Sequence, residues 1–186
     1  GAGFQADHAL ADRSAGGQHD DGQPRPAAQA AGDLQAVLAG QAEIEDHDIV
    51  YRDAAKPGDA APAGKPAPQT AAWRRTLKTD EAVLFRYSAL IFNAHRIHYD
   101  IDYCRDTEGY PGLIVHGPLQ TTLLLDLCRR SDPRPVRTLD YRATHPVFHQ
   151  ETFSVNGQPA ADGESVELWT ANAAGNYAMR GTATFG

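Results

Sequence analysis

The last third of the chain alternates between apolar and polar positions with the period of a β-strand. The alternation is clearest in residues 165–169 and again in 177–180, and this period is typical of strands that bury one face. With the neighbouring apolar stretches it predicts four strands, at residues 136–148, 151–155, 164–171 and 177–185. Three dipeptides of the kind that favours tight turns separate these strands: Asn156-Gly157, Asp162-Gly163 and Gly175-Asn176.

Upstream of these strands the pattern predicts one strand and two helices. The strand lies within residues 70–80, and acidic residues after Thr79 indicate a helix over 81–92. The second helix begins at Pro118, because proline is favoured in a first helical turn, and runs to about residue 130. The first helix is expected to bury Val83, Leu84, Tyr87, Leu90 and Ile91. This order predicts an α+β protein of the hotdog type, in which a curved antiparallel sheet wraps around one long helix.

The N-terminal third has a different composition. Residues 1–41 are rich in Ala, Gly, Gln and Asp and contain one aromatic residue, Phe4. Such a segment buries too little apolar surface to offset its ordering entropy, so we expect it to be low-complexity and disordered. Residues 42–70 combine a short strand-like patch with a Pro- and Ala-rich linker. The folded hotdog domain is therefore expected to span residues 71–186.

Charge and cysteine content narrow the class of protein. The formal net charge is −7, which argues against a general nucleic-acid binder, since such binding needs clustered Lys and Arg. Two cysteines, Cys104 and Cys128, are too few for a disulfide framework and indicate a reducing compartment. No apolar run reaches the roughly 18 residues of a membrane span. We expect a cytoplasmic protein without membrane contact, or one of the mitochondrial matrix if the source is eukaryotic.

Candidate chemistry is concentrated between residues 85 and 130. A polar cluster follows the first helix, and a Gly-rich turn at 109–117 opens into the second. A helix N-terminus presents unpaired N–H groups that carry a partial positive charge. Imidazoles beside such a terminus can support hydration or hydrolysis. The spacing of His95, His98 and Asp100 does not match a zinc motif, so no metal is expected.

Two segments carry a family resemblance: FRYSALIFNAHRIHYD (85–100) and EGYPGLIVHGPLQTTLL (108–124). In this order they resemble the MaoC-like, (R)-specific enoyl-CoA hydratases, which are hotdog proteins. The nearest branch contains the itaconyl-CoA and mesaconyl-C4-CoA hydratases and the mitochondrial 3-hydroxyacyl-thioester dehydratase. The resemblance covers residues 42–186. Fuller members carry two hotdog units, and a complete second unit of roughly 110–140 residues does not fit before Trp73. We therefore expect one of two explanations for the missing upstream unit: a shortened gene product, or residues 1–41 that are not native to the family.

The resemblance implies a catalytic arrangement. The family motif places an acidic residue, a histidine and an aspartate at the positions of Asn93, His98 and Asp100. His98 and Asn93 would hold the water that adds to an enoyl thioester, and the backbone N–H of Gly117 would bind the thioester oxygen. Asn93 departs from the commoner aspartate. A neutral amide orients water but cannot accept its proton, so His98 would be the only strong base near neutral pH.

Most of the other candidate site residues have two alternative roles. Arg96 either anchors a substrate carboxylate, as a dicarboxylic acyl-CoA requires, or pairs with Asp100 structurally. Asp100 would fix His98 or Arg96 and not act as base. Tyr110 lines the acyl pocket or packs in the core. His116 supports the turn or faces a partner subunit, and Pro118 follows as part of the substrate-binding turn.

The reaction implied is reversible hydration of a 2-enoyl-CoA, or of an acyl-carrier-protein thioester, to the 3-hydroxyacyl thioester without a cofactor. Two rivals stay open. A hotdog thioesterase would need a carboxylate on the central helix, where Asp126 is the only acid and lies far from the N-terminus. A non-catalytic acyl-CoA-binding subunit would suit Asn93. Since hotdog units pair at their sheet edges, we also expect a homodimer.

Overall fold

The computed structural model describes residues 63–186. The expectations for residues 1–41 and 42–62 lie outside the described residues. The described chain divides into two compact units, residues 81–113 and residues 63–80 with 114–186.

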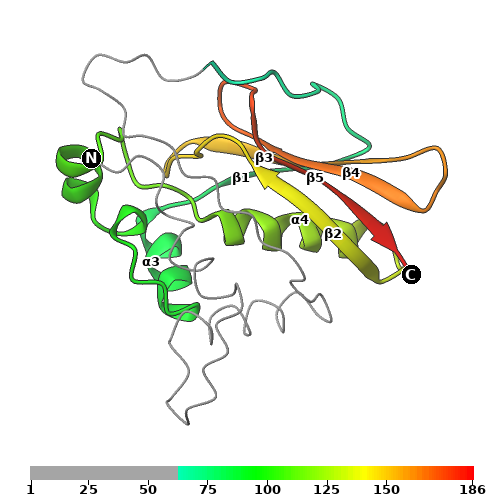
Figure 1. Ribbon diagram of the computed structural model, residues 1–186, viewed down its shortest axis with the longest axis horizontal. Coiled ribbons are helices and arrows are strands. Elements are labelled where there is room, and N and C mark those ends of the chain that lie inside the picture. The colour runs from blue at the N-terminus through cyan, green and yellow to red at the C-terminus, as the bar shows by residue number, and fades with distance from the viewer. Residues whose placement is uncertain (1–62) are drawn as a thin grey trace, which may run out of the picture. The chain divides into compact units, whose positions relative to one another are not determined.

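The larger unit contains one antiparallel sheet and one long helix (Figure 1). The strand order is β1-β3-β4-β5-β2, and every neighbouring pair is antiparallel. The helix α4 (Gly117–Ser131) runs along one face of the sheet. The strands are β1 (Trp73–Lys78), β2 (Val136–Ala143), β3 (Thr152–Pro159), β4 (Ser165–Ala171) and β5 (Tyr177–Phe185). The predicted α+β class and the hotdog arrangement are confirmed.

The core of this unit follows the predicted periodicity only in part. Val155, Val166 and Ala183, from three neighbouring strands, are fully buried. Strand β1 alternates between exposed and half-buried residues, as expected when successive side chains point to opposite faces, whereas five consecutive residues of β3, 153–157, are buried. On α4 the buried positions recur at helical spacing: Gln120, Leu124, Leu125, Leu127 and Cys128. The apolar run after Pro118 therefore forms the helix face that packs on the sheet.

One predicted turn is wrong. Asn156-Gly157 lies inside β3, where Asn156 pairs with Arg74 and Trp169 and Gly157 pairs with Trp73 and Leu168. A Cβ on Gly157 would lie 2.8 Å from Trp73 Cε3, so the glycine gives the indole room on the strand. Strand β3 consequently extends to Pro159, beyond the predicted end at 155. Strand β2 ends at Ala143 and not at 148.

Part of the expected linker packs on this sheet. The Ala67 N–H donates to Gly175 O, and the Tyr177 N–H donates to Lys65 O, both at 2.9 Å. Ala67 is buried in a small cluster with Trp169 and Ala171. Residues 63–70 thus continue the folded domain upstream of the predicted boundary at 71.

The smaller unit contains α3 (Glu81–Leu90), a 3₁₀ turn η1 (Arg96–His98) and a π-helical turn η2 (Tyr103–Thr107). Leu84, Tyr87 and Ile91 are buried as predicted. Val83 and Leu90 are not, with 39% and 51% of their surface exposed, because they lie on a flank of the helix and not at the centre of its buried face.

Helix α3 also ends two residues before the predicted end at 92. Phe92 has φ 54, in the left-handed region. The Asn93 N–H donates to Ser88 O at 2.9 Å and the Phe92 N–H donates to Ala89 O at 3.3 Å. These two bonds form a Schellman cap, with Phe92 in the place that glycine commonly takes. The cap turns the chain sharply and delivers Asn93 at the start of the polar loop.

Within residues 63–186, no helix has the length and apolarity to cross a membrane. In the same span, no three His, Cys, Asp or Glu side chains are grouped so as to hold a metal ion.

Candidate functional site

The polar loop of the smaller unit begins with an Asx turn. The side-chain Oδ1 of Asn93 accepts a hydrogen bond from the His95 N–H at 2.9 Å, the local contact that Asn and Asp make readily. The amide oxygen of Asn93 is therefore directed at the backbone. Its Nδ2 group, which can only donate, is the part left to meet a ligand.

His98 closes the 3₁₀ turn that follows. Its N–H donates to His95 O at 3.3 Å, and the residue is 2% exposed. The imidazole lies edge-on to that of His95, with 5.9 Å between ring centroids and 67° between ring planes. Asn93 and His98, which the sequence motif pairs, thus belong to one tight loop in which backbone hydrogen bonds limit the movement of both.

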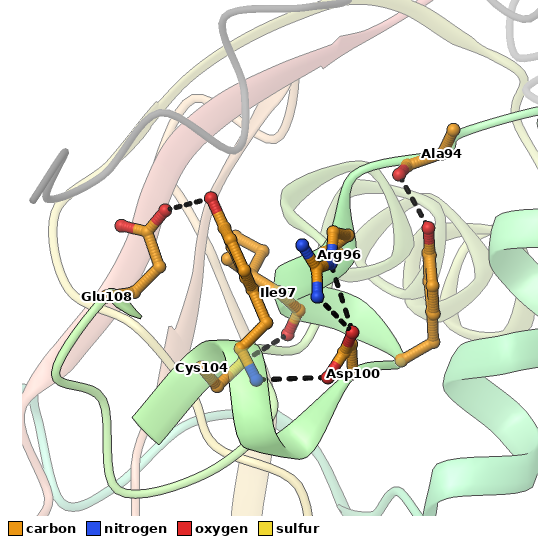
Figure 2. Close-up of polar contacts among 8 residues, drawn as sticks. Ala94, Arg96, Ile97, Asp100, Cys104 and Glu108 are labelled. Carbon is orange, nitrogen blue, oxygen red and sulfur yellow. Dashed lines mark hydrogen bonds and ion pairs between the residues drawn. The ribbon is translucent and has the colours of Figure 1, made fainter. Parts of the chain in front are cut away.

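Arg96 and Asp100 form an ion pair on the outside of this turn (Figure 2). Arg96 Nε and Nη2 donate to Asp100 Oδ2 at 3.0 and 2.8 Å, and the Tyr103 N–H donates to Oδ1 at 3.0 Å. The guanidinium also lies 4.2 Å from the centroid of the Tyr103 ring. Of the two partners predicted for Asp100, these contacts join it to Arg96. The structural pairing expected for Arg96 is therefore present.

The same contacts define the charge state of Asp100. The backbone N–H of Tyr103, and then the Arg96 side chain, lower the pKa of this carboxyl below its ordinary value. Hydrogen bonds to an ionised carboxylate favour the ionised form. Asp100 is consequently an anion that fixes Arg96, and it is a poor candidate for the catalytic base.

Sequence reasoning missed three residues of this region: Tyr103, Cys104 and Glu108. The Tyr103 hydroxyl donates to Glu108 Oε1 at 2.8 Å, and the Cys104 thiol donates to Ile97 O at 3.1 Å (Figure 2). Tyr110, predicted to line an acyl pocket, donates its N–H to Cys104 O at 2.8 Å. The spacing of Arg96, Asp100 and Tyr103 on one helical face was the available signal, but a π-helical turn has no sequence signature of its own.

The larger unit holds the other predicted residues at the start of α4. His116 is the N-cap residue and is fully buried, and Pro118 occupies the first turn. Proline has no N–H to lose there. The other N–H groups of the first turn, including that of Gly117, have no acceptor within the helix itself. Further along this turn, Gln120 Oε1 accepts from Thr170 Oγ1 at 2.7 Å, and both side chains are buried. This bond fixes the N-terminal turn of α4 to β4.

Asp126, the acid of α4, has two cationic partners. Arg130 Nε donates to its Oδ2 at 2.8 Å, and Arg75 of β1 bonds the same oxygen. The bond from Arg130, with that from Arg75, lowers the pKa of Asp126. A carboxylate held by two guanidinium groups is a structural anion, which weighs against the role that a thioesterase would require of it.

Comparisons with known proteins agree with the motifs. Residues 30–149 match the model of the family described as hydroxyacyl-thioester dehydratase type 2. The mesaconyl-C(4)-CoA hydratase of Chloroflexus aurantiacus is 41% identical over 145 residues, which are 76% of this chain and 50% of that protein. The mitochondrial hydroxyacyl-thioester dehydratase type 2 of Schizosaccharomyces pombe is 39% identical over 76 residues, 39% of this chain and 25% of the relative. The chain thus spans half or less of the length of these relatives.

Solved structures resemble the chain at lower identity. HtdX of Mycobacterium tuberculosis has a TM-score of 0.56 and 21% identity, over 74% of this chain and 53% of that one. An (R)-hydratase of A. caviae involved in PHA biosynthesis has a TM-score of 0.50 and 19% identity, over 68% of this chain and 96% of that one. These two likenesses show the fold. With the family match over more than half of its residues, the chain belongs to the type 2 hydroxyacyl-thioester dehydratases.

Proposed function

We propose that this chain catalyses the reversible addition of water to a 2-enoyl thioester, giving a 3-hydroxyacyl thioester. The observation that carries the proposal is the loop in which the Asx turn of Asn93 leads directly to the buried His98. In a member of this family, an imidazole and an amide donor so close in the chain suit the activation of a water molecule.

In the proposed mechanism His98 is the base. Asn93 Nδ2 donates to the oxygen of the water, while the water donates one hydrogen to the His98 imidazole. His98 takes that proton as the hydroxide bonds to the β-carbon, and the electron pair of the alkene moves towards the thioester carbonyl. His98 then returns the proton to the α-carbon, so that one water has been added and nothing else is consumed.

The thioester oxygen becomes negative during this step. We propose that the backbone N–H of Gly117 at the start of α4 stabilises it, as the family resemblance implies. One such donor is typically worth about 2.7–4 kcal/mol of the barrier. His116 and Pro118 would shape this turn, and Tyr110 would contact the acyl group. No cofactor enters the scheme.

For the substrate we propose a CoA thioester with a second carboxylate on its acyl group. Arg96 uses Nε and Nη2 for Asp100, while its side chain is 55% exposed. Asp100 and the Tyr103 ring hold the guanidinium in a fixed orientation, so little side-chain entropy would be lost when its outer edge binds a carboxylate. The name of the Chloroflexus relative supports an acyl group of this kind.

We further propose that the chain pairs through a sheet edge. Among residues 63–186, strands β1 and β2 are the outer strands of the sheet, and edge strands invite pairing with another sheet. A symmetric homodimer would satisfy this need. Sedimentation at micromolar concentration should give the mass of a dimer, and a clean monomer would contradict the pairing.

One assay separates the functional alternatives. Purified protein is given crotonyl-, mesaconyl- and itaconyl-CoA, while the ultraviolet absorbance of the enoyl thioester and the free thiol are followed together. Loss of the enoyl band without thiol release is the expected result, and His98→Ala should abolish it while the circular dichroism stays unchanged. Thiol release would instead indicate a thioesterase. Binding of crotonyl-CoA without turnover would indicate an acyl-CoA-binding subunit.

A further inference from the structure

The π-helical turn η2 brings a buried thiol against the backbone that carries His98. Cys104 is completely buried, and its Sγ lies 3.1 Å from the carbonyl oxygen of Ile97. Figure 2 shows the Cys104 side chain directed at that carbonyl. Ile97 C=O and His98 N–H belong to the same peptide group. The thiol therefore hydrogen-bonds to the peptide group that leads directly into the Cα of His98, which carries the imidazole.

Backbone hydrogen bonds hold the rest of this turn. The His98 N–H donates to His95 O, and the N–H groups of Tyr99 and Asp100 donate to Arg96 O. The Cys104 N–H donates to Asp100 O at 3.0 Å. The Ile97 carbonyl oxygen lies between these bonds and accepts a hydrogen bond from the Cys104 thiol. A buried carbonyl that loses its donor is costly, so removal of the thiol would favour rotation of this peptide group.

The thiol is suited to a permanent donor role. Burial raises the pKa of Cys104 to about 11, and the nearby carboxylates of Asp100 and Glu108 act in the same direction. The sulfur therefore keeps its proton at neutral pH and is a weak nucleophile. The second cysteine is similar in these respects: Cys128 is buried in α4, and burial raises its pKa to about 11 as well. It lies in the larger unit, away from the polar loop in sequence, and serves as a matched control.

We infer that Cys104 is a positioning residue for His98, because its thiol fixes the Ile97–His98 peptide group and with it the direction of the imidazole. The inference rests on the proposed function, in which His98 is the base. A base that is displaced from its water loses rate more than it loses substrate affinity.

The test compares Cys104→Ala, Cys104→Ser and Cys128→Ala in the hydration assay. Alanine removes the donor, whereas serine keeps a hydroxyl donor in nearly the same volume. We expect kcat of Cys104→Ala to fall about tenfold with KM changed less than about twofold. Cys104→Ser should recover most of the lost rate, and Cys128→Ala should resemble wild type. Equal losses in both Cys104 variants would show that volume, and not the hydrogen bond, matters, and would overturn the inference.

A second readout does not depend on turnover. The amide ¹⁵N shift of His98 reports on hydrogen bonding to the carbonyl of the same peptide group. This signal, together with the imidazole signals of His98, should move in Cys104→Ala and return towards wild type in Cys104→Ser. If wild-type protein has no hydratase activity, the proposed function fails while this comparison still decides the structural role of the thiol. Unmoved His98 signals in Cys104→Ala would overturn the inference.

Discussion

At the scale of single residues, Asn93 is the main departure from the motif that the family resemblance implies. Its side chain has two tasks in the proposed scheme: Oδ1 accepts from the His95 N–H, and Nδ2 donates to the water. An aspartate could keep the first bond with one oxygen and accept a hydrogen from water with the other. The water would then have two acceptors in place of one, and the reaction would no longer depend on His98 alone.

We therefore expect Asn93→Asp to retain or increase the hydration rate at neutral pH. Asn93→Ala should lower kcat by about 10- to 100-fold, since water loses its orienting donor and the turn loses its Asx bond. Steady-state kinetics with the preferred enoyl-CoA measures both effects, and thermal unfolding separates them from loss of structure. An Asn93→Ala variant with full activity would remove this residue from the mechanism.

At the scale of elements, the end of α3 combines a helix cap with an unfavourable residue. Phe92 adopts a left-handed backbone conformation, which costs an L-residue roughly 1–2 kcal/mol relative to glycine. Its side chain is 67% exposed, so its replacement sacrifices little burial. Glycine at this position would keep the Schellman bonds and remove the strain.

Phe92→Gly should thus raise the free energy of unfolding by about 1 kcal/mol, as measured by urea denaturation. Phe92→Ala removes the same aromatic ring but keeps a Cβ, so it should gain less. Phe85→Ala provides a matched control, because Phe85 is 62% exposed on an ordinary helical turn of the same helix. A gain in Phe85→Ala equal to that in Phe92→Gly would trace the effect to the exposed ring instead of the backbone.

The elements also show how far the sequence could predict this protein. Periodicity and turn signals predicted the order of strands and helices. The turn prediction failed at Asn156-Gly157, because contacts within the sheet override the preference of this dipeptide. The Asn156 side-chain amide donates to Trp169 O of the neighbouring strand and to Ser154 Oγ of its own strand. Motif spacing placed Asn93 and His98 in one loop. The contact of Cys104 with Ile97 joins residues seven positions apart, at the start of a π-helical turn that has no sequence signature of its own.

At the scale of the whole molecule, stability against acid depends on the carboxylates that hold elements together. Asp126 joins α4 to β1 through Arg75 and has Arg130 as a second partner. These bonds lower its pKa below the ordinary value of 3.8. A carboxyl with a depressed pKa in the folded state stabilises the fold above its unfolded pKa, and this contribution is lost as pH falls through the folded value. The network is partly exposed, so solvent screens it and its contribution is modest.

Asp126→Asn should accordingly lower the free energy of unfolding at pH 7 by roughly 0.5–1 kcal/mol. The difference from wild type should persist down to about pH 5 and begin to shrink near about pH 4. It should close only as the pH falls below the lowered pKa of the folded state, where the wild-type carboxyl also becomes neutral. Asp132→Asn is a comparison and not a neutral control. Asp132 binds Arg134, two residues away, and the hydrogen bonds from Arg134 lower its pKa to about 2. Asp132→Asn should therefore also lose stability at pH 7 and regain parity with wild type in acid, although this local pair links no elements. Because Asp126 belongs to the scaffold and not to the proposed chemistry, Asp126→Asn should hydrate its substrate at close to the wild-type rate. A pH-independent stability loss would show that the side chain acts through packing, and a loss of all turnover in folded protein would favour a hydrolase that uses this carboxylate.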